Sequence, residues 1–229
     1  TDTGLDEGTY RYQVTAHDHA GWESPPSNTL ELTVDLTPPT TRIRVPGDGD
    51  AVSDLVDIKG TAFSLDDFKE ARLTIGEGAS PGVWSPIANV TIPVSYGLLG
   101  SWDTMNLPEG PYALKLEAED LNGNIGTHQI TVHIDNSPPD PPVLLTATQT
   151  DPLTPDVDLN WEANTEPDLA GYLLYCNDAL ANVSGTVIGD LKPYLIDTIT
   201  FIDTGLPDGT FSWFLMAMDE AGNLSAPSN

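Results

Sequence analysis

The stretch Asp2-Thr-Gly-Leu-Asp-Glu-Gly-Thr-Tyr10 returns 201 residues later as Asp203-Thr-Gly-Leu-Pro-Asp-Gly-Thr-Phe211. Residues 2–28 align without a gap on residues 203–229, and 14 of these 27 positions are identical. A third, more divergent copy begins at Asp103 and continues to Asp120-Leu-Asn-Gly-Asn124. The copies lie about 100 residues apart, which is the size of one small β-sandwich. The sequence therefore predicts an array of such units.

Each copy contains an alternating stretch that predicts a strand with one face on a core. The residues expected on the core face are Tyr10, Tyr12, Val14 and Ala16 in the first copy, and Tyr112, Leu114, Leu116 and Ala118 in the middle copy. Ala113 and Lys115 are expected on the opposite face. Every such strand ends in Asp-x-x-Gly, a turn in which the aspartate bonds to the backbone and glycine supplies positive φ. We therefore expect an all-β protein.

Proline pairs mark the boundaries between the units. Asp35-Leu-Thr-Pro-Pro39 and Asp135-Asn-Ser-Pro-Pro139 lie 100 residues apart. Proline fixes φ and donates no hydrogen bond to a sheet, so these segments predict short, stiff connectors. The expected organisation is a partial unit (1–36), a complete unit (37–137) and a nearly complete unit (138–229).

Residues 138–229 resemble a fibronectin type III domain. The resemblance is carried by the proline-rich entry, by Val157-Asp-Leu-Asn-Trp161, by Glu166-Pro-Asp-Leu-Ala-Gly-Tyr172 and by the repeat from Thr200 to Asp219. It implies that Trp161 and Tyr172 lie in the core. Phe211 stands where the family usually has a corner tyrosine, which Tyr10 and Tyr112 retain.

Residues 37–137 are similar to a bacterial immunoglobulin-like domain, and residues 1–36 match the last two strands of a type III domain. The matching features of the middle unit are Gly76-Glu-Gly78, Trp84, Gly100-Ser-Trp-Asp-Thr104 and an alternating strand over Thr127–Ile134. The resemblance implies tandem immunoglobulin-like and fibronectin type III β-sandwiches. These families comprise adhesive, spacer and accessory modules without chemistry of their own, so function is not assigned by fold alone.

The charge balance excludes several classes of partner. The chain has 35 acidic and 8 basic residues and a formal net charge of -27. Nucleic acid and anionic membrane surfaces both require cationic proteins, so neither is an expected partner. No apolar run approaches the roughly 20 residues that span a bilayer. The one cysteine, Cys176, lies in an apolar run and is interpreted as a small buried side chain. An extracellular or cell-surface location is expected from the family resemblance.

No grouping of residues predicts catalysis, and no cofactor is expected apart from calcium. Asp120, Asn122 and Asn124 place oxygen-bearing side chains at alternate positions, as at the start of a calcium-binding loop. The glutamate that completes an EF-hand loop twelve positions on is absent, since residue 131 is threonine. The alternative interpretation is an Asp-capped turn without a metal.

Three functions are compatible with these features. The first is a structural or interaction segment, such as a stalk, fibre or adhesin. The second is an accessory region of a secreted hydrolase, either a protease or a polysaccharide-degrading enzyme. The third is a carbohydrate-binding module, for which Trp22 and Trp84 are the candidate contacts.

The repeat also predicts that residues 138–229 lack the closing strand that residues 29–34 give to the first copy. Separate chains are therefore expected either to need a neighbouring repeat or to join head to tail into a filament.

Overall fold

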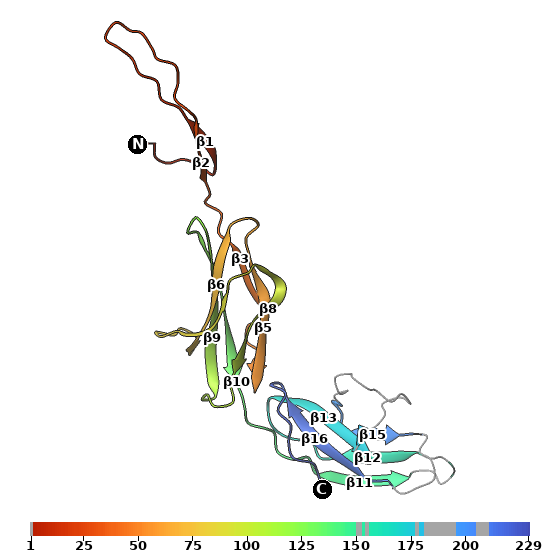
Figure 1. The fold of residues 1–229 in the computed structure, drawn as a ribbon. Coiled ribbons are helices and arrows are strands. Elements are labelled where there is room, and N and C mark those ends of the chain that lie inside the picture. Colours follow the sequence, from red (N-terminus) through yellow and green to blue (C-terminus); the bar gives the residue numbers. More distant parts are fainter. Residues whose placement is uncertain (1, 150–152, 154–155, 177–178, 181–195, 205–210) are drawn as a thin grey trace.

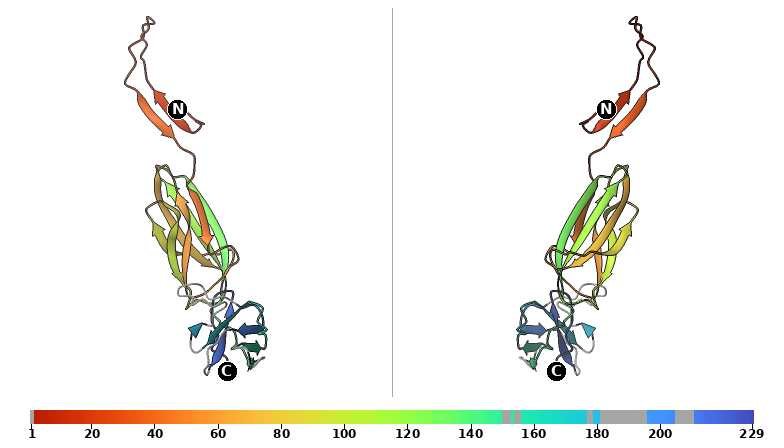
Figure 2. Two further views of the ribbon diagram at one scale, coloured as in Figure 1. Left: turned by 90° about the vertical axis from the view of Figure 1, so that its right-hand side faces the viewer. Right: turned by 90° about the vertical axis from the view of Figure 1, so that its left-hand side faces the viewer.

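The computed structural model describes residues 2–149, 153, 156–176, 179–180, 196–204 and 211–229. The described residues form strands, turns and loops, and none of them lies in a helix that could cross a membrane. The strands fall into three groups that follow one another along an elongated molecule (Figures 1 and 2). The prediction of an all-β protein is confirmed.

The first group is an isolated antiparallel hairpin of β1 (Gly8–Tyr12) and β2 (Leu30–Val34), in which Tyr10 pairs with Leu32. The expected strand reaches further, but β1 stops at Tyr12. Beyond it, the main-chain nitrogens of Val14 and Ala16 donate to the hydroxyls of Ser27 and Ser24. Pro25 and Pro26 lie between these serines and have no N–H, so a regular ladder cannot continue.

The second group is a complete sandwich of eight strands. They are β3 (Thr40–Val45), β4 (Ala51–Val52), β5 (Leu55–Phe63), β6 (Phe68–Glu77), β7 (Ser85–Val90), β8 (Val94–Asp103), β9 (Gly110–Asp120) and β10 (Ile125–Ile134). One sheet has the order β3-β5-β8 and the other β4-β10-β9-β6-β7. β4 pairs with β10 in parallel, whereas the other pairs are antiparallel. The chain therefore contributes β3 to one sheet and then β4 to the other, which joins the two sheets at this edge of the sandwich.

The alternation in β9 places its apolar face in this core. Tyr112, Leu114, Leu116 and Ala118 are all buried, and Tyr112 packs against Trp102 with ring centroids 5.8 Å apart. The expectation that Ala113 faces solvent is wrong, because Ala113 is also buried. The loop before β7 folds over that outer face, where the Trp84 ring lies 4.5 Å from Lys115 Nζ.

The third group is a second sandwich. Its strands are β11 (Leu144–Gln149), β12 (Val157–Trp161), β13 (Leu169–Cys176), β14 (Ala179–Leu180), β15 (Thr200–Asp203) and β16 (Trp213–Asp219). The sheets have the orders β11-β12-β15 and β14-β13-β16. The core contains Leu159, Trp161, Tyr172, Leu174, Leu215 and Ala217. Cys176 ends β13, but its side chain lies outside the described part of the structure.

In this third group, the free edge of β16 carries no further strand among the described residues. Instead, residues 225–228 run along it, with Ser225 N and Ser228 N donating to the carbonyls of Ala217 and Leu215. This is the edge where the closing strand of the sandwich was predicted to be lacking.

Candidate functional site

The turn after β9 is built on the buried carboxylate of Asp120. Its Oδ1 accepts hydrogen bonds from the main-chain nitrogens of Asn122 (2.9 Å) and Asn124 (2.8 Å), and Gly123 has a φ of 90°. The carboxylate thus replaces backbone turn contacts, and glycine takes the left-handed conformation without a steric cost. Asp18 and Asp219 build the same kind of turn.

Asn124 links this turn to the connector between the first and second units. Its Nδ2 donates to Asp120 Oδ2 (2.9 Å) and to the main-chain oxygen of Asp35 (3.2 Å). One amide group therefore joins a buried carboxylate of the second unit to the beginning of the Asp35–Pro39 connector.

Asn223 makes the same connection at the second junction. Its Nδ2 donates to Asp219 Oδ2 (2.8 Å) and to the main-chain oxygen of Asp135 (2.8 Å). We call the Asn124–Asp35 and Asn223–Asp135 contacts the linker clamps. The two asparagines are 99 residues apart and the two aspartates 100, so the clamps belong to the repeat.

The connector is also held from the side of the preceding unit. Thr37 N donates to Asp35 Oδ1 (3.0 Å), and Thr37 Oγ1 donates to Glu7 Oε2 (2.6 Å). The second junction repeats these contacts, at 3.1 and 2.6 Å, with Asp135, Ser137 and Glu109. Each connector is therefore fixed by side chains of the units on both sides of it.

A third aspartate lies at each junction, directly before β6 in the second unit and directly before β13 in the third. Leu121 N donates to the main-chain oxygen of Asp67 (2.7 Å), and Glu220 N donates to that of Asp168 (2.8 Å). The first junction consequently assembles Asp35, Asp67 and Asp120, and the second assembles Asp135, Asp168 and Asp219.

The junctions differ at one position. In the first, Asn122 Nδ2 donates to both Asp35 Oδ2 (2.9 Å) and Asp67 Oδ2 (3.0 Å). In the second, Ala221 occupies the equivalent place, and its main-chain oxygen accepts from Ser53 Oγ (2.9 Å). At the first junction, a side-chain amide therefore donates to two carboxylates, and at the second junction Ala221 has no such amide.

This difference has an electrostatic consequence. Hydrogen bonds from the Ser64 hydroxyl, from the Asp35 side chain and from the Asn122 amide lower the pKa of Asp67 from its ordinary value of 3.8. At the second junction, burial and the neighbouring carboxylates of Asp219 and Asp168 raise the pKa of Asp135 from the same ordinary value. One carboxyl group at each junction therefore has a shifted pKa, and the two shifts have opposite signs.

The first junction also contains the grouping that best suits a cation. Asp35, Asp67 and Asp120 each bring one carboxylate oxygen to within 4.8 Å of the others. A hollow of about 490 Å³ beside them is lined by further acidic residues, including Glu7 and Asp66. Of the three calcium ligands predicted from the sequence, Asp120 is part of this grouping. Asn122 and Asn124 direct their Nδ2 atoms toward acidic oxygens.

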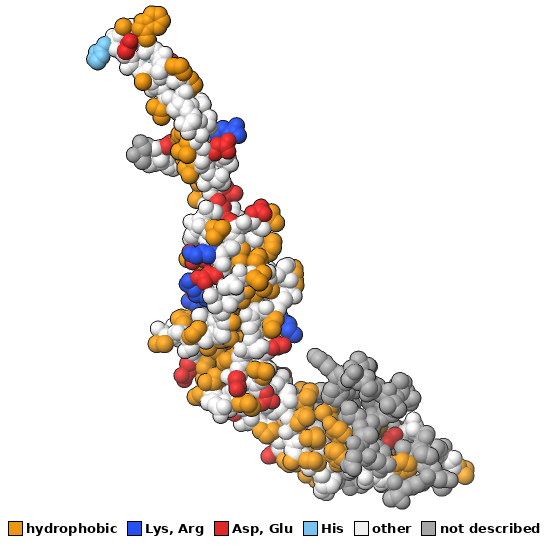
Figure 3. Space-filling model, viewed as in Figure 1, with side chains coloured by type: hydrophobic (Ala, Val, Ile, Leu, Met, Phe, Trp, Pro, Cys, Tyr) orange, Lys and Arg blue, Asp and Glu red, His pale blue; other side chains and the backbone are white. Residues whose placement is uncertain are grey.

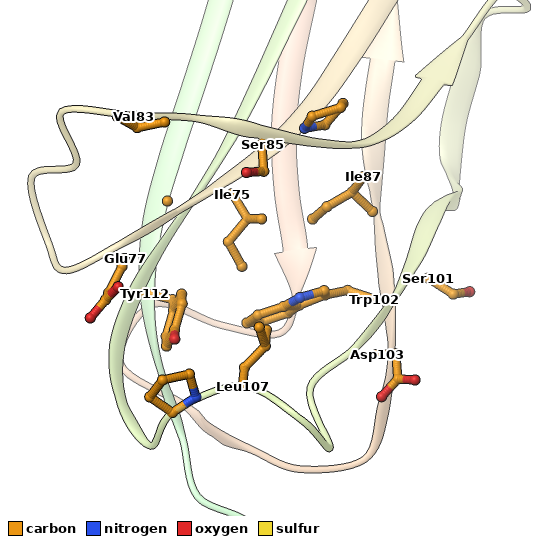
Figure 4. A pocket seen from close by; sticks show the side chains of 13 residues that line it. Ile75, Glu77, Val83, Ser85, Ile87, Ser101, Trp102, Asp103, Leu107 and Tyr112 are labelled. Atoms are coloured by element: carbon orange, nitrogen blue, oxygen red, sulfur yellow. The ribbon is translucent and has the colours of Figure 1, made fainter.

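A larger hollow lies elsewhere, on the flank of the second unit between the edge strands β7 and β8. It has a volume of about 600 Å³, and Trp102, Tyr112, Leu107, Ile75 and Ile87 extend into it (Figure 4). Its lining includes Ser85 and Ser101 but no histidine, cysteine or lysine. Its acidic members are Glu77 and Asp103.

The two tryptophans considered for carbohydrate binding lie in different units. Trp22 is 77% exposed in the loop of the hairpin, where it occupies the position that Asn124 and Asn223 hold in the other copies. Trp84 is half-buried beside Lys115 in the second unit. They therefore do not combine into one flat binding platform.

The remaining sequence-selected residues are structural. Trp161 and Tyr172 are buried, with ring centroids 5.5 Å apart. Tyr10 donates from its hydroxyl to the main-chain oxygen of Asp6 (2.9 Å), which is the corner contact that Phe211 lacks. Phe211 is half-buried beside Trp213.

The linker clamps were not found from the sequence. The motif Asp-x-x-Gly-Asn was interpreted as a turn, but the connector that its last asparagine contacts lies nearly 90 residues away. The available signal was that Asp35 and Asn124 recur together as Asp135 and Asn223.

Comparison with known proteins gives a sequence relative and solved structures of similar fold. No protein-family model matches the chain. The chain is 29% identical over 245 aligned residues to Exoglucanase B of Cellulomonas fimi, and the match covers all of this chain but 20% of that protein. The chain therefore spans about a fifth of this curated relative.

Two solved structures share the fold. The FN1–FN3 domains of chicken CNTN1 superpose with a TM-score of 0.55 and 16% identity, over 96% of this chain and 75% of theirs. The fibronectin(III)-like modules of Clostridium thermocellum CbhA superpose with a TM-score of 0.51 and 12% identity, over 81% of this chain and 89% of theirs. The predicted resemblance to fibronectin type III and immunoglobulin-like modules is thus confirmed for the fold.

Proposed function

We propose that this chain is a non-catalytic spacer of a secreted or cell-surface modular protein, and that it holds successive β-units at fixed orientations. The observation that supports this most is the repeated linker clamp, in which Asn124 and Asn223 bond to the main-chain oxygens of Asp35 and Asp135. A side-chain contact to a connector does not contribute to the core of either unit. Its effect is to restrict how one unit turns relative to the next.

The physical basis of this restriction is the burial of the groups that hold each asparagine. Asp120 and Asp219 are buried carboxylates, and buried polar groups require hydrogen-bond partners. Each asparagine is held in place by its bond to the buried carboxylate, so rotation of the connector costs the second bond, to the main-chain oxygen of Asp35 or Asp135. The prolines that follow each connector aspartate add stiffness because they fix φ.

The parent protein that we propose is a polysaccharide-degrading enzyme, in which the chain is an accessory region. The match to Exoglucanase B over the whole of this chain supports this parent over a stalk, fibre or adhesin. In such an enzyme, a stiff spacer would set the distance between a catalytic domain and a surface-binding domain.

The test compares the orientations of the second and third units in wild-type protein and in Asn223→Ala. Residual dipolar couplings are measured for both units, and small-angle X-ray scattering gives the overall dimensions. In the wild type, we expect both units to share one alignment tensor. In Asn223→Ala, we expect the couplings of the third unit to be scaled down as its orientations broaden.

Asn89→Ala is the matched control. Asn89 donates to Glu70 on the surface of the second unit, within one sheet, and far from either connector in sequence. We expect its couplings to match those of the wild type. Equal couplings for Asn223→Ala and wild type would contradict the proposal that the clamp fixes the junction.

A further inference from the structure

Residues 14–27 of the hairpin make the same hydrogen bonds as residues 215–228 of the third unit. Ser27 N donates to Val14 O at 2.9 Å, and the equivalent Ser228 N donates to Leu215 O at 2.7 Å. Val14 N donates to the hydroxyl of Ser27, as Leu215 N does to that of Ser228, both at 3.0 Å. The two segments therefore present the same face by the same backbone geometry.

The equivalent faces differ completely in exposure. Val14 is 73% exposed, whereas its counterpart Leu215 is fully buried. Ala16 is exposed, whereas Ala217 is buried. Leu30 and Leu32 of β2 are exposed as well, so apolar side chains line the surface of the hairpin (Figure 3). A soluble protein normally covers such a face.

The third unit shows what covers this face where it is buried. Leu215 and Ala217 pair with Leu174 and Tyr172 of β13, and Leu159 and Trp161 of β12 belong to the same core. The face is thus covered by the opposite sheet β11-β12-β15, while β13 extends the sheet of β16. In the hairpin, β1 pairs only with β2 among the described residues, and no second sheet lies against it (Figure 1).

An independent observation assigns the hairpin to the same class of unit. The superposition on the three domains of the chicken protein covers 96% of this chain, so it must extend well into residues 2–36. The hairpin therefore lies where part of a type III domain lies in that structure.

We propose that the apolar face of residues 2–36, centred on Val14, Ala16 and Leu32, docks on an open half-sandwich built like β11–β15. The partner is a polypeptide segment of the fibronectin type III class that presents one core tryptophan and one core tyrosine, equivalent to Trp161 and Tyr172. The hairpin supplies the last two strands of that sandwich. This interface is separate from the linker clamps and does not depend on the proposed spacer function.

The first test extends the full chain by placing a second copy of residues 138–201 directly before Thr1. Residue 202 aligns with residue 1, so this join preserves the register of the repeat. We expect hydrogen exchange at the amides of residues 9–16 and 30–34 to slow by at least about tenfold, because they become part of a cooperative core. Unchanged exchange in the folded fusion would overturn the proposal.

Val14→Asp is the matched variant for this fusion. In the original chain, we expect no change in melting temperature, because Val14 is exposed. In the fusion, the same substitution buries a carboxylate and should abolish the new protection. Equal effects of Val14→Asp in both proteins would contradict docking of this face.

A chimera tests the same idea without relying on the fusion. Residues 203–229 are replaced by residues 2–36, so that Val14 takes the place of Leu215. We expect the third unit to fold and to unfold at a higher temperature than in the wild type, since β2 adds the missing edge strand. An unfolded third unit beside a folded second unit would overturn the proposal.

The unmodified chain is examined by sedimentation velocity over a wide concentration range. We expect a monomer whose hairpin amides exchange rapidly. A concentration-dependent dimer with slowed exchange at residues 9–16 would assign the face to a second copy of the chain, as in the head-to-tail filament, and would reject the half-sandwich partner.

Discussion

The side-chain amide of Asn122 donates to Asp67 at the first junction, with Nδ2 3.0 Å from Oδ2. The same amide donates to Asp35 Oδ2, so it neutralises part of the repulsion between two carboxylates. At the second junction, Ala221 has no amide to offer, and the pKa of Asp135 is raised by burial and by Asp219 and Asp168. The two junctions are built on the same repeat, and Asn122 makes at the first a pair of contacts that Ala221 does not make at the second.

The first prediction concerns the pH dependence of the two junctions. The folded pKa of Asp67 is below its unfolded value, so its stabilising contribution is present above about pH 3.8 and is lost as the pH falls further. The folded pKa of Asp135 is raised, so the folded state binds its proton first and is stabilised as the pH falls toward 3.8. Carboxyl carbon shifts measured by NMR should place the Asp67 midpoint below 3.8 and the Asp135 midpoint above it.

Two substitutions, Ala221→Asn and Asn122→Ala, test whether the amide at this position causes the pKa shifts. Ala221→Asn should lower the midpoint of Asp135, and Asn122→Ala should raise that of Asp67, because the amide donor is gained in one and lost in the other. Midpoints that do not move in either variant would show that the residue at this position does not control the titration.

The second prediction is calcium binding at the first junction, where Asp35, Asp67 and Asp120 converge. Oxygen ligands of this kind suit calcium, and Asn122 would have to turn its side-chain oxygen toward the ion. Binding to the folded state alone raises the melting temperature through linkage. We expect the melting temperature to be higher in millimolar calcium than in EDTA, and Asp67→Asn to remove this difference.

Sodium chloride at matched ionic strength is the control for calcium. A chain with a net charge of -27 is stabilised by any salt that screens its repulsion. Equal melting temperatures in EDTA and calcium, or an equal rise in sodium chloride, would refute specific calcium binding.

The third prediction concerns the packing of the connector on β10. A Cβ added at Gly126 would lie 2.0 Å from the main-chain oxygen of Pro39, which is closer than any real contact. Gly126→Ala should therefore displace the connector and cost about 1–3 kcal/mol of unfolding free energy. Gly82→Ala is the control, since nothing lies within 4 Å of its added Cβ. A stable Gly126→Ala protein with unshifted Pro39 resonances would contradict the close approach.

Local patterns were sufficient to predict those parts of the fold that neighbouring residues determine. The two-residue period of Tyr112 to Ala118 predicted a strand and its buried face, because side chains alternate along a strand. Asp120 and Gly123 predicted their turn, because its hydrogen bonds span only four residues. The same period over Tyr10 to Ala16 did not produce a buried face, since burial requires a second sheet that residues 2–36 do not themselves contain.

The candidate site depended on contacts that the sequence does not encode locally. Asn124 and Asp35 are 89 residues apart, and only the assembled fold brings them to 3.2 Å. Asp67 carries no such signal, because nothing in its own segment indicates that the turn after β9 lies beside it. The periodic recurrence of Asp35 as Asp135 was visible, but the contact that it serves was not.

The last prediction concerns the core of the third unit. Trp161 is buried against Tyr172, and replacement by alanine should cost roughly 3–5 kcal/mol, as for other large-to-small changes in a core. Its indole Nε1 has no hydrogen-bond partner among the described residues, so the ring is held by packing. Trp161→Phe should therefore lose much less than Trp161→Ala, because it keeps an aromatic ring and removes an unpaired N–H. Urea denaturation followed by NMR separates the third unit from the second, and an alanine variant that loses less than about 1 kcal/mol would show that Trp161 is not a core residue.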